Sequence, residues 1–141
     1  MSRPRTRTIE QTVNIPATPL QVYHAIMDPK EHSEFTGEDA EGSDEVGGVF
    51  RAYGGYITAK NIELEKGKRI LQEWTTTEWP EGYPPSMLDI RLSKSGEGTE
   101  LRMIHSSVPE EQADSYAEGW TDHYWSKLRE HFLLKKGRKK S

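Results

Sequence analysis

The stretch of sequence that decides the fold is PEEQADSYAEGWTDHYWSKLREHFLL, residues 109–134. Apolar and aromatic residues recur in it at steps of four, and these are Tyr116, Trp120, Tyr124, Leu128 and Phe132. This spacing places them in one stripe along a helix, while most of the charged residues between them face water. A proline and two glutamates at the start suit the first turn of a helix. The stretch therefore predicts a long helix whose stripe needs a broad apolar surface to cover it.

Gly119 lies in the middle of this predicted helix. Glycine in a helix interior costs about 1 kcal/mol relative to alanine. We therefore expect a packing reason for it, namely a neighbouring backbone that approaches the helix closely at that turn.

The residues before the helix predict the surface that covers it. Residues 8–15 alternate as a strand does, and Thr18-Pro19 and Asp28-Pro29 suit the starts of two short helices. Five further strands follow in the pattern, at residues 49–53, 56–64, 69–79, 87–93 and 99–106. Gly54-Gly55 indicates a two-residue hairpin between the first two of these. The predicted fold class is α+β, a curved antiparallel sheet wrapped around the long C-terminal helix, an arrangement that often leaves a cavity between them.

Composition and charge exclude several classes of protein. The chain has 141 residues, enough for one domain, and no cysteine, so disulfides and thiolate sites are absent. No apolar run approaches the roughly 20 residues of a membrane span, and the N-terminus lacks the apolar core of a signal peptide. We therefore predict a cytoplasmic protein without a membrane span.

The net charge of −4 is unevenly distributed. Residues 1–7 and 135–141 carry eight basic residues and no acidic one, and we predict that both are disordered basic tails. Residues 8–134 form the single predicted domain, with 23 acidic against 11 basic residues. An acidic body repels phosphates, so nucleic acid is not expected to lie across the fold.

The order of these elements resembles a known family. It is similar to the helix-grip fold of the START and Bet v 1-like (SRPBCC) superfamily, and within it to the C-terminal domain of the activator of the heat-shock-protein-90 ATPase, the AHSA family. The matching pieces, in the family's order, are Phe35-Thr36, Gly47-Gly48-Val49-Phe50, Ile70 to Trp74, Trp79-Pro80-Glu81-Gly82, Thr99-Glu100-Leu101, and Gly119-Trp120 with Tyr124 and Phe132.

The resemblance implies a helix-grip fold and, less directly, a stress-related co-chaperone role with a chaperone as partner. The eukaryotic activator also has a separate N-terminal domain that contributes much of its chaperone contact. We expect that this chain has no room for that domain.

Catalytic and metal-binding patterns are sparse in the sequence. The five histidines form no HExxH pair, and no nucleophile elbow of the GxSxG type is present. The acidic segment 38–45 does not match an EF-hand loop, so we interpret it as a solvated loop. We predict no metal site and no cofactor. His105 is the best candidate for a functional imidazole, although a strand histidine with an ordinary hydrogen bond explains it equally simply.

The aromatic residues and methionines suggest a binding site. We predict that a small apolar ligand contacts residues that point between sheet and helix, namely Trp74, Met87, Met103, His105, Trp120 and Tyr124. The simpler alternative is that these side chains only pack the core. Trp79 and Tyr83, beside a proline-rich loop, are predicted to contact a protein partner or to line the cavity entrance.

The leading functional prediction is a non-enzymatic, monomeric domain that binds a small hydrophobic molecule or a protein partner. The alternative is a cyclase or hydrolase of the SRPBCC type acting on a hydrophobic substrate in the same cavity. That alternative requires a polar pair such as His105 and Tyr124 inside the cavity.

Overall fold

The computed structural model describes residues 5–140, with the side chains described up to residue 135. Its elements in chain order are β1 (Thr6–Ile15), α1 (Pro19–Met27), α2 (Pro29–Thr36), β2 (Glu41–Gly42), β3 (Val49–Ala52), η1 (Tyr53–Gly55), β4 (Ile57–Glu65), β5 (Arg69–Thr76), β6 (Ser86–Ser95), β7 (Gly98–Pro109), α3 (Glu110–Gly119), η2 (Trp120–Trp125) and α4 (Ser126–Lys140).

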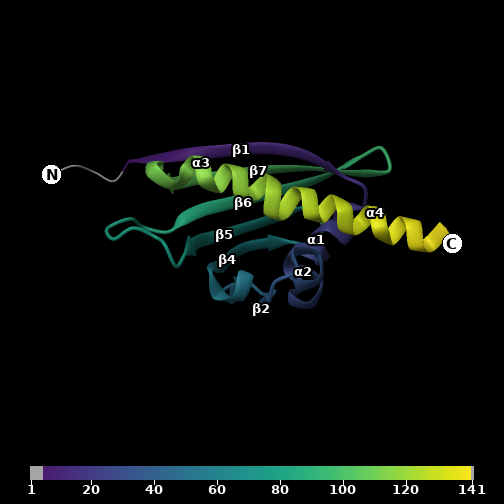
Figure 1. The fold of residues 1–141 in the computed structure, drawn as a ribbon, viewed down its shortest axis with the longest axis horizontal. Helices are drawn as coiled ribbons and strands as arrows, with labels where there is room; N and C mark the ends of the chain where they lie inside the picture. Colours follow the sequence, from purple (N-terminus) through teal and green to yellow (C-terminus); the bar gives the residue numbers. More distant parts are fainter. Residues whose placement is uncertain (1–4, 141) are drawn as a thin grey trace.

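The strands form one antiparallel seven-stranded sheet in the order β1-β7-β6-β5-β4-β3-β2. The helical segment α3–η2–α4 runs obliquely along the sheet, while α1 and α2 lie together below α4 (Figure 1). The predicted α+β helix-grip fold is therefore confirmed.

Local sequence signals explain where the two short helices begin and end. The Thr18 side chain accepts from the backbone N–H of Gln21, and Gln21 returns a bond to the backbone N–H of Thr18, so α1 begins with a capping box. The Asp28 side chain caps α2 in the same way, through the N–H of Glu31. Gly37, with a φ of 79°, ends α2 in the left-handed conformation that glycine adopts without penalty.

The connection between β3 and β4 differs from the predicted two-residue hairpin. Ala52 pairs with Ile57, so the loop holds four residues, and its first three form the short helix η1. Tyr53, Gly54 and Gly55 all have positive φ values, of 54°, 65° and 94°. The stretch of positive φ therefore begins one residue before the glycines, at Tyr53. A positive φ is sterically unfavourable there, because tyrosine, unlike glycine, has a Cβ atom.

The long C-terminal helix has the predicted buried stripe, but it is not a regular α-helix. Tyr116, Trp120, Tyr124, Leu128 and Phe132 are all at most 9% exposed. Between Trp120 and Trp125 the helix widens into a π-helical turn, in which the N–H of Ser126 bonds to the carbonyl of Thr121. This wider turn brings Trp125 inward beside Tyr124, so both side chains are buried.

The two predicted tails lie partly outside the described residues, at 1–4 and 141. Within the described part of the chain, β1 begins at Thr6 and α4 is helical through Lys140. None of the helices in residues 5–140 is both long and apolar enough to cross a membrane.

Candidate functional site

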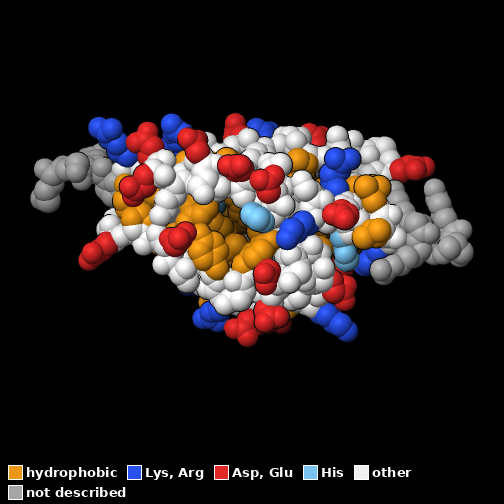
Figure 2. All heavy atoms as spheres, in the orientation of Figure 1, with side chains coloured by type: hydrophobic (Ala, Val, Ile, Leu, Met, Phe, Trp, Pro, Cys, Tyr) orange, Lys and Arg blue, Asp and Glu red, His pale blue; other side chains and the backbone are white. Residues whose placement is uncertain are grey.

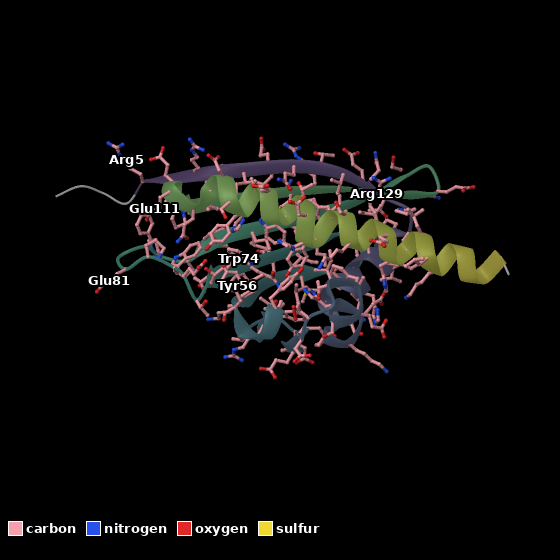
Figure 3. All side chains as sticks on the ribbon, viewed as in Figure 1. Arg5, Tyr56, Trp74, Glu81, Glu111 and Arg129 are labelled. Carbon is pink, nitrogen blue, oxygen red and sulfur yellow. The ribbon has the colours of Figure 1, made fainter. Side chains whose placement is uncertain are left out.

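A pocket of about 390 Å³ lies between the C-terminal helix and the sheet, beside η1 and the start of β4. Figure 2 shows it as a hollow floored by hydrophobic side chains, with charged groups around its rim. Tyr56 and Trp74, both labelled in Figure 3, line this pocket. The complete lining consists of Glu38, Tyr53, Tyr56, Ile57, Trp74, Tyr116, Gly119, Trp120, His123, Tyr124 and Lys127.

Aromatic rings in contact with one another form the inner wall of the pocket. The Trp74 ring meets Tyr116 nearly edge-on, with 5.2 Å between ring centroids, and lies 5.7 Å from the Trp120 ring. Trp120 in turn lies 4.8 Å from Tyr124. Such edge-to-face and tilted contacts stabilise the rings against one another. The wall therefore offers a preformed apolar surface to a ligand.

The mouth of the pocket is held by a contact between η1 and the π-helical turn. The Tyr53 hydroxyl donates a hydrogen bond to the backbone carbonyl of His123. Burial, with Glu38 nearby, raises the pKa of Tyr53 to about 12, so this donor keeps its proton at neutral pH. Lys127, on the same side, donates to the carbonyl of Thr36 at the end of α2, 3.0 Å away. The Tyr53 hydroxyl and the Lys127 ammonium group are thus both bonded to backbone carbonyls.

Gly119 lines the pocket, but the reason predicted for it is wrong. A Cβ atom added there would meet only the Cδ2 of His123, at 3.9 Å. Among the described residues, no backbone approaches the helix closely at this turn. The glycine instead leaves the wall of the pocket without a side chain at this point.

His105 is buried behind the aromatic wall in a chain of hydrogen bonds. The hydroxyl of Ser86 donates to the carbonyl of Trp74 at 2.7 Å, so it must accept from the Nε2 of His105, 2.8 Å away. The Nε1–H of Trp120 then donates to the Nδ1 of His105 at 3.1 Å. Both ring nitrogens are therefore used, and the imidazole is neutral with its proton on Nε2. Burial lowers the pKa of His105 to about 3.

His32 is a second buried, neutral imidazole, with the opposite tautomer. Its Nδ1–H donates to the carbonyl of Ile26 at 2.9 Å, which leaves Nε2 to accept from the Tyr124 hydroxyl at 3.2 Å. Burial lowers the pKa of His32 to about 4, although the bond to Ile26 opposes this shift. Burial raises the pKa of Tyr124 well above its ordinary value, so the phenol stays protonated.

The sequence-predicted ligand residues divide into three groups in the structure. Trp74, Trp120 and Tyr124 meet at the pocket. Met103 and His105, both fully buried, belong to the core and are not among the residues that line the pocket.

Met87 faces the other side of the sheet, which corrects the orientation predicted for it. In β6 its neighbours Ser86 and Leu88 are buried, whereas Met87 is half-buried and pairs with Glu73 and Ser106. Because successive side chains of a strand point to opposite faces, a shift of one position reverses the prediction.

The two predicted partner-binding residues are half-buried. Trp79 closes the end of the core, where it stacks on Tyr116 with 6.2 Å between ring centroids and donates through Nε1 to the carbonyl of Pro84. Tyr83 lies in the loop that this bond closes. Neither residue lines the pocket mouth.

Sequence reasoning missed Tyr53 and Tyr56 as pocket residues. The pattern predicted them to be strand residues beside a hairpin, where no long-range contact with the helix is visible. The signal that could have indicated them is two aromatic residues flanking a glycine pair, since glycines let a loop fold over a neighbouring surface.

A larger and more polar groove, of about 1030 Å³, lies at the other end of the helix, between α1 and α4. Its organising group is Glu31, whose carboxylate contacts His24 at 2.7 Å, His131 at 2.9 Å and Lys135 at 3.1 Å. Partial burial alone would raise the pKa of Glu31, but these hydrogen bonds outweigh it and lower the pKa. The groove thus contains a hydrogen-bond network around Glu31 that joins α1, α2 and α4. The smaller aromatic pocket is the better ligand site because its walls are apolar and preformed.

Comparison with known proteins shows which family this chain is similar to. The family described as "Activator of Hsp90 ATPase homolog 1-like protein" matches residues 16–132. A relative from Dictyostelium discoideum, "Activator of 90 kDa heat shock protein ATPase homolog", is 26% identical over 131 residues, which cover 92% of this chain and 34% of the relative. The chain spans about a third of the length of the curated relatives it matches.

Solved structures share the fold. The crystal structure of an HSP90 activator from Plasmodium falciparum superposes with a TM-score of 0.81 at 22% identity, covering 91% of this chain and 96% of that one. The crystal structure of Ara h 8.0201 superposes with a TM-score of 0.73 at 11% identity, covering 92% and 99% of the two chains.

Proposed function

Because this chain belongs to the family of activator of Hsp90 ATPase homolog 1-like proteins, we propose that it is a binding domain whose pocket receives a small hydrophobic molecule. The observation that carries this proposal is the pocket of about 390 Å³ between helix and sheet. Its size falls within the range of small-molecule sites, which are concave and largely apolar with a few polar groups.

The hydrogen bonds of the buried polar groups favour binding over the alternative of a cyclase or hydrolase. That alternative needs His105 and Tyr124 to act together on a substrate. The structure pairs His105 with Ser86 and Trp120, and it pairs Tyr124 with His32. A general acid or base must reach the proton that it transfers, and both nitrogens of His105 already bond to protein groups.

The experiment is a titration with a naphthalene-based probe, followed by tryptophan fluorescence. Trp74 and Trp120 line the pocket, so we expect saturable quenching by a bound aromatic ring. Tyr56→Ala, which removes part of the wall, is expected to weaken binding. Met87→Ala is the matched control, because Met87 is on the opposite face of the sheet and its loss should leave binding unchanged. Quenching that does not saturate, or that both variants alter equally, would rule out this site.

A second candidate function is contact with a chaperone of the Hsp90 class. It is favoured by the names of the curated relatives, which are activators of that chaperone's ATPase. A second linked contact module can raise avidity by about 10²–10⁴, so the stimulation of ATP turnover by residues 1–141 is measured up to a high protein concentration.

The acidic loop at residues 38–45 offers a surface for such a contact. Its five carboxylate residues are exposed, and the buried Asn61 holds the loop by donating to the carbonyls of Ser43 and Glu45. We propose that association depends on salt, because exposed charges are screened beyond about 10 Å at 0.1 M. The test is ATP turnover by the host's chaperone at low and moderate salt, with charge reversal at Glu41 and Glu45. Turnover that stays at its basal rate as the domain approaches millimolar concentration would rule out the chaperone contact. Ligand binding would then be the remaining candidate function.

Native mass spectrometry of the protein purified from its own host addresses both candidates. A retained small molecule supports the first, a co-purified chaperone supports the second, and the mass of the free species tests the proposed monomer.

A further inference from the structure

Trp74 differs from the other tryptophans of this protein in the hydrogen bonding of its indole N–H. Trp79, Trp120 and Trp125 each donate through Nε1 to a protein acceptor, at distances of 2.8 Å to 3.1 Å. Among residues 5–135, the Nε1–H of Trp74 has no hydrogen-bond partner, although the residue is only 4% exposed. A buried indole N–H normally has a partner. The unpaired donor of Trp74 therefore requires an explanation.

The Nε1–H of Trp74 borders a space inside the molecule. In the described part of the chain, every fully enclosed side-chain nitrogen or oxygen atom has a hydrogen-bond partner, so an unpaired Nε1 is not fully enclosed. Trp74 lines the aromatic pocket of about 390 Å³ and a small cavity of about 30 Å³, which share Ile57, Trp120 and Tyr124. The small cavity has room for about one water molecule. Of these two spaces, the pocket alone has room for a ligand.

The other polar groups of the aromatic wall are already bonded to the protein. The tyrosine hydroxyls that line the pocket all have protein partners, and they belong to Tyr53, Tyr56, Tyr116 and Tyr124. The indole N–H of Trp120 is bonded to His105. Of the two charged residues in the lining, Glu38 is exposed and Lys127 is bonded to a backbone carbonyl. The wall formed by Trp74, Tyr116, Trp120 and Tyr124 therefore offers one free hydrogen-bond donor and no charge.

We propose that the Nε1–H of Trp74 recognises the ligand, and that the ligand is an uncharged hydrophobic molecule whose inner end carries a hydrogen-bond acceptor such as a carbonyl oxygen. A molecule without an acceptor would exclude water from this donor and leave it unpaired, which weakens binding. A carboxylate would lose its hydration without gaining a cation in the aromatic wall. This inference rests on the proposed function, since it names the ligand class of the same pocket.

Three naphthalene probes of closely similar shape test the acceptor: 2-acetylnaphthalene, 2-isopropenylnaphthalene and 2-naphthoate. They carry a carbonyl, a C=CH₂ group and a carboxylate at the same position, and their affinities are measured by tryptophan fluorescence. The quantity of interest is the preference, defined as the Kd of the isopropenyl probe divided by the Kd of the acetyl probe.

Trp74→Phe removes the N–H and keeps an aromatic ring. Because one neutral hydrogen bond is lost, the preference should fall about tenfold from its wild-type value. Naphthoate should bind the wild type about tenfold more weakly than the acetyl probe does, because its charge loses hydration. An unchanged preference in Trp74→Phe would overturn the role of the N–H. Naphthoate as the tightest of the three probes would overturn the uncharged ligand class.

Trp120→Phe is the matched control. Trp120 lines the same pocket and is also buried, but its N–H is bonded to His105. Its replacement should weaken the acetyl and isopropenyl probes together and leave the preference at the wild-type value. A preference that falls equally in Trp74→Phe and Trp120→Phe would reflect a general loss of packing, and it would overturn the specific role of the Trp74 N–H.

The indole N–H signals in NMR spectra test the same bond in the wild type, should Trp74→Phe fail to fold. The chain has four tryptophans, and the signal of Trp74 is assigned by elimination from Trp79→Phe, Trp120→Phe and Trp125→Phe. The acetyl probe should move the Trp74 signal to lower field, as a new hydrogen bond does, whereas the isopropenyl probe should not. A Trp74 signal that both probes leave in place, or move equally, would overturn the inference.

The outcomes separate this inference from the proposed function. If the wild type binds the probes saturably but shows neither the change in preference nor the shift of the Trp74 signal, the donor is wrong while the pocket remains a ligand site. If the wild type binds none of the three probes, the pocket itself is not a site for such ligands, and the proposed function fails with it.

Discussion

Lowering the pH from 7.5 to 5 should destabilise this protein by about 4 kcal/mol. The reason is that two histidines, His32 and His105, are buried and neutral in the folded state. In the unfolded chain an imidazole has a pKa of about 6.5. In the folded protein, burial lowers the pKa of His32 to about 4 and that of His105 to about 3. The unfolded state therefore binds two protons in this range that the folded state does not.

The sign and size follow from proton linkage. As the pH drops, the free energy of unfolding decreases wherever the unfolded state binds more protons than the folded state. Each pH unit below the unfolded pKa of about 6.5 costs about 1.36 kcal/mol for each histidine, as long as the folded imidazole stays neutral. At pH 5, about 1.5 units below that value, each histidine therefore accounts for a loss of about 2 kcal/mol. The full stability is present above about pH 6.5, and the loss continues until the pH passes the folded values near 4 and 3. A loss of about 4 kcal/mol is a large part of the 5–15 kcal/mol typical of a domain.

The assay is urea unfolding, followed by tryptophan fluorescence, at half-unit steps between pH 8 and 5. His105→Gln removes one buried imidazole and should reduce the loss to about 2 kcal/mol, even though the variant begins less stable at pH 8. His123→Gln, at an exposed position, is the matched control and should show the same loss as the parent. A wild-type stability that is constant within about 1 kcal/mol across this range would refute the assignment of neutral, buried imidazoles.

Three further changes test the packing by urea unfolding at pH 8. Trp120→Ala should cost about 3–5 kcal/mol, since the side chain is 5% exposed and its N–H bonds to His105; a loss below about 1 kcal/mol would mean that the sheet does not grip the helix. Met103→Ala should cost about 2–5 kcal/mol and Met87→Ala clearly less, because only Met103 is fully buried; equal losses would contradict the facing of β6. Thr18→Ala removes the cap of α1 and should cost about 1 kcal/mol, whereas Thr18→Ser, which keeps the hydroxyl, should cost little.

The sequence by itself determined the features that depend on local periodicity and local hydrogen bonds. The steps of four from Tyr116 to Phe132 predicted the buried stripe of the C-terminal helix, because positions four apart lie on one helix face whatever the helix packs against. The inward face of β7 was equally readable, since Thr99, Leu101 and Met103 alternate with exposed charged residues. Thr18 and Asp28 marked helix starts because a cap needs only the next three residues.

Only the tertiary structure decided which residues form the candidate site. In β6, Ser86 faces inward and Met87 outward, against the expectation from side-chain polarity, because the Ser86 hydroxyl is bonded to the carbonyl of Trp74 and to His105, residues far away in the chain. Tyr53 reaches the pocket because η1 folds over to the carbonyl of His123. The π-helical turn that buries Trp125 beside Tyr124 depends on a partner as well, since the Nε1–H of Trp125 donates to Gln11 of β1. Each of these placements depends on a hydrogen bond between residues distant in sequence. Local sequence patterns do not predict such hydrogen bonds.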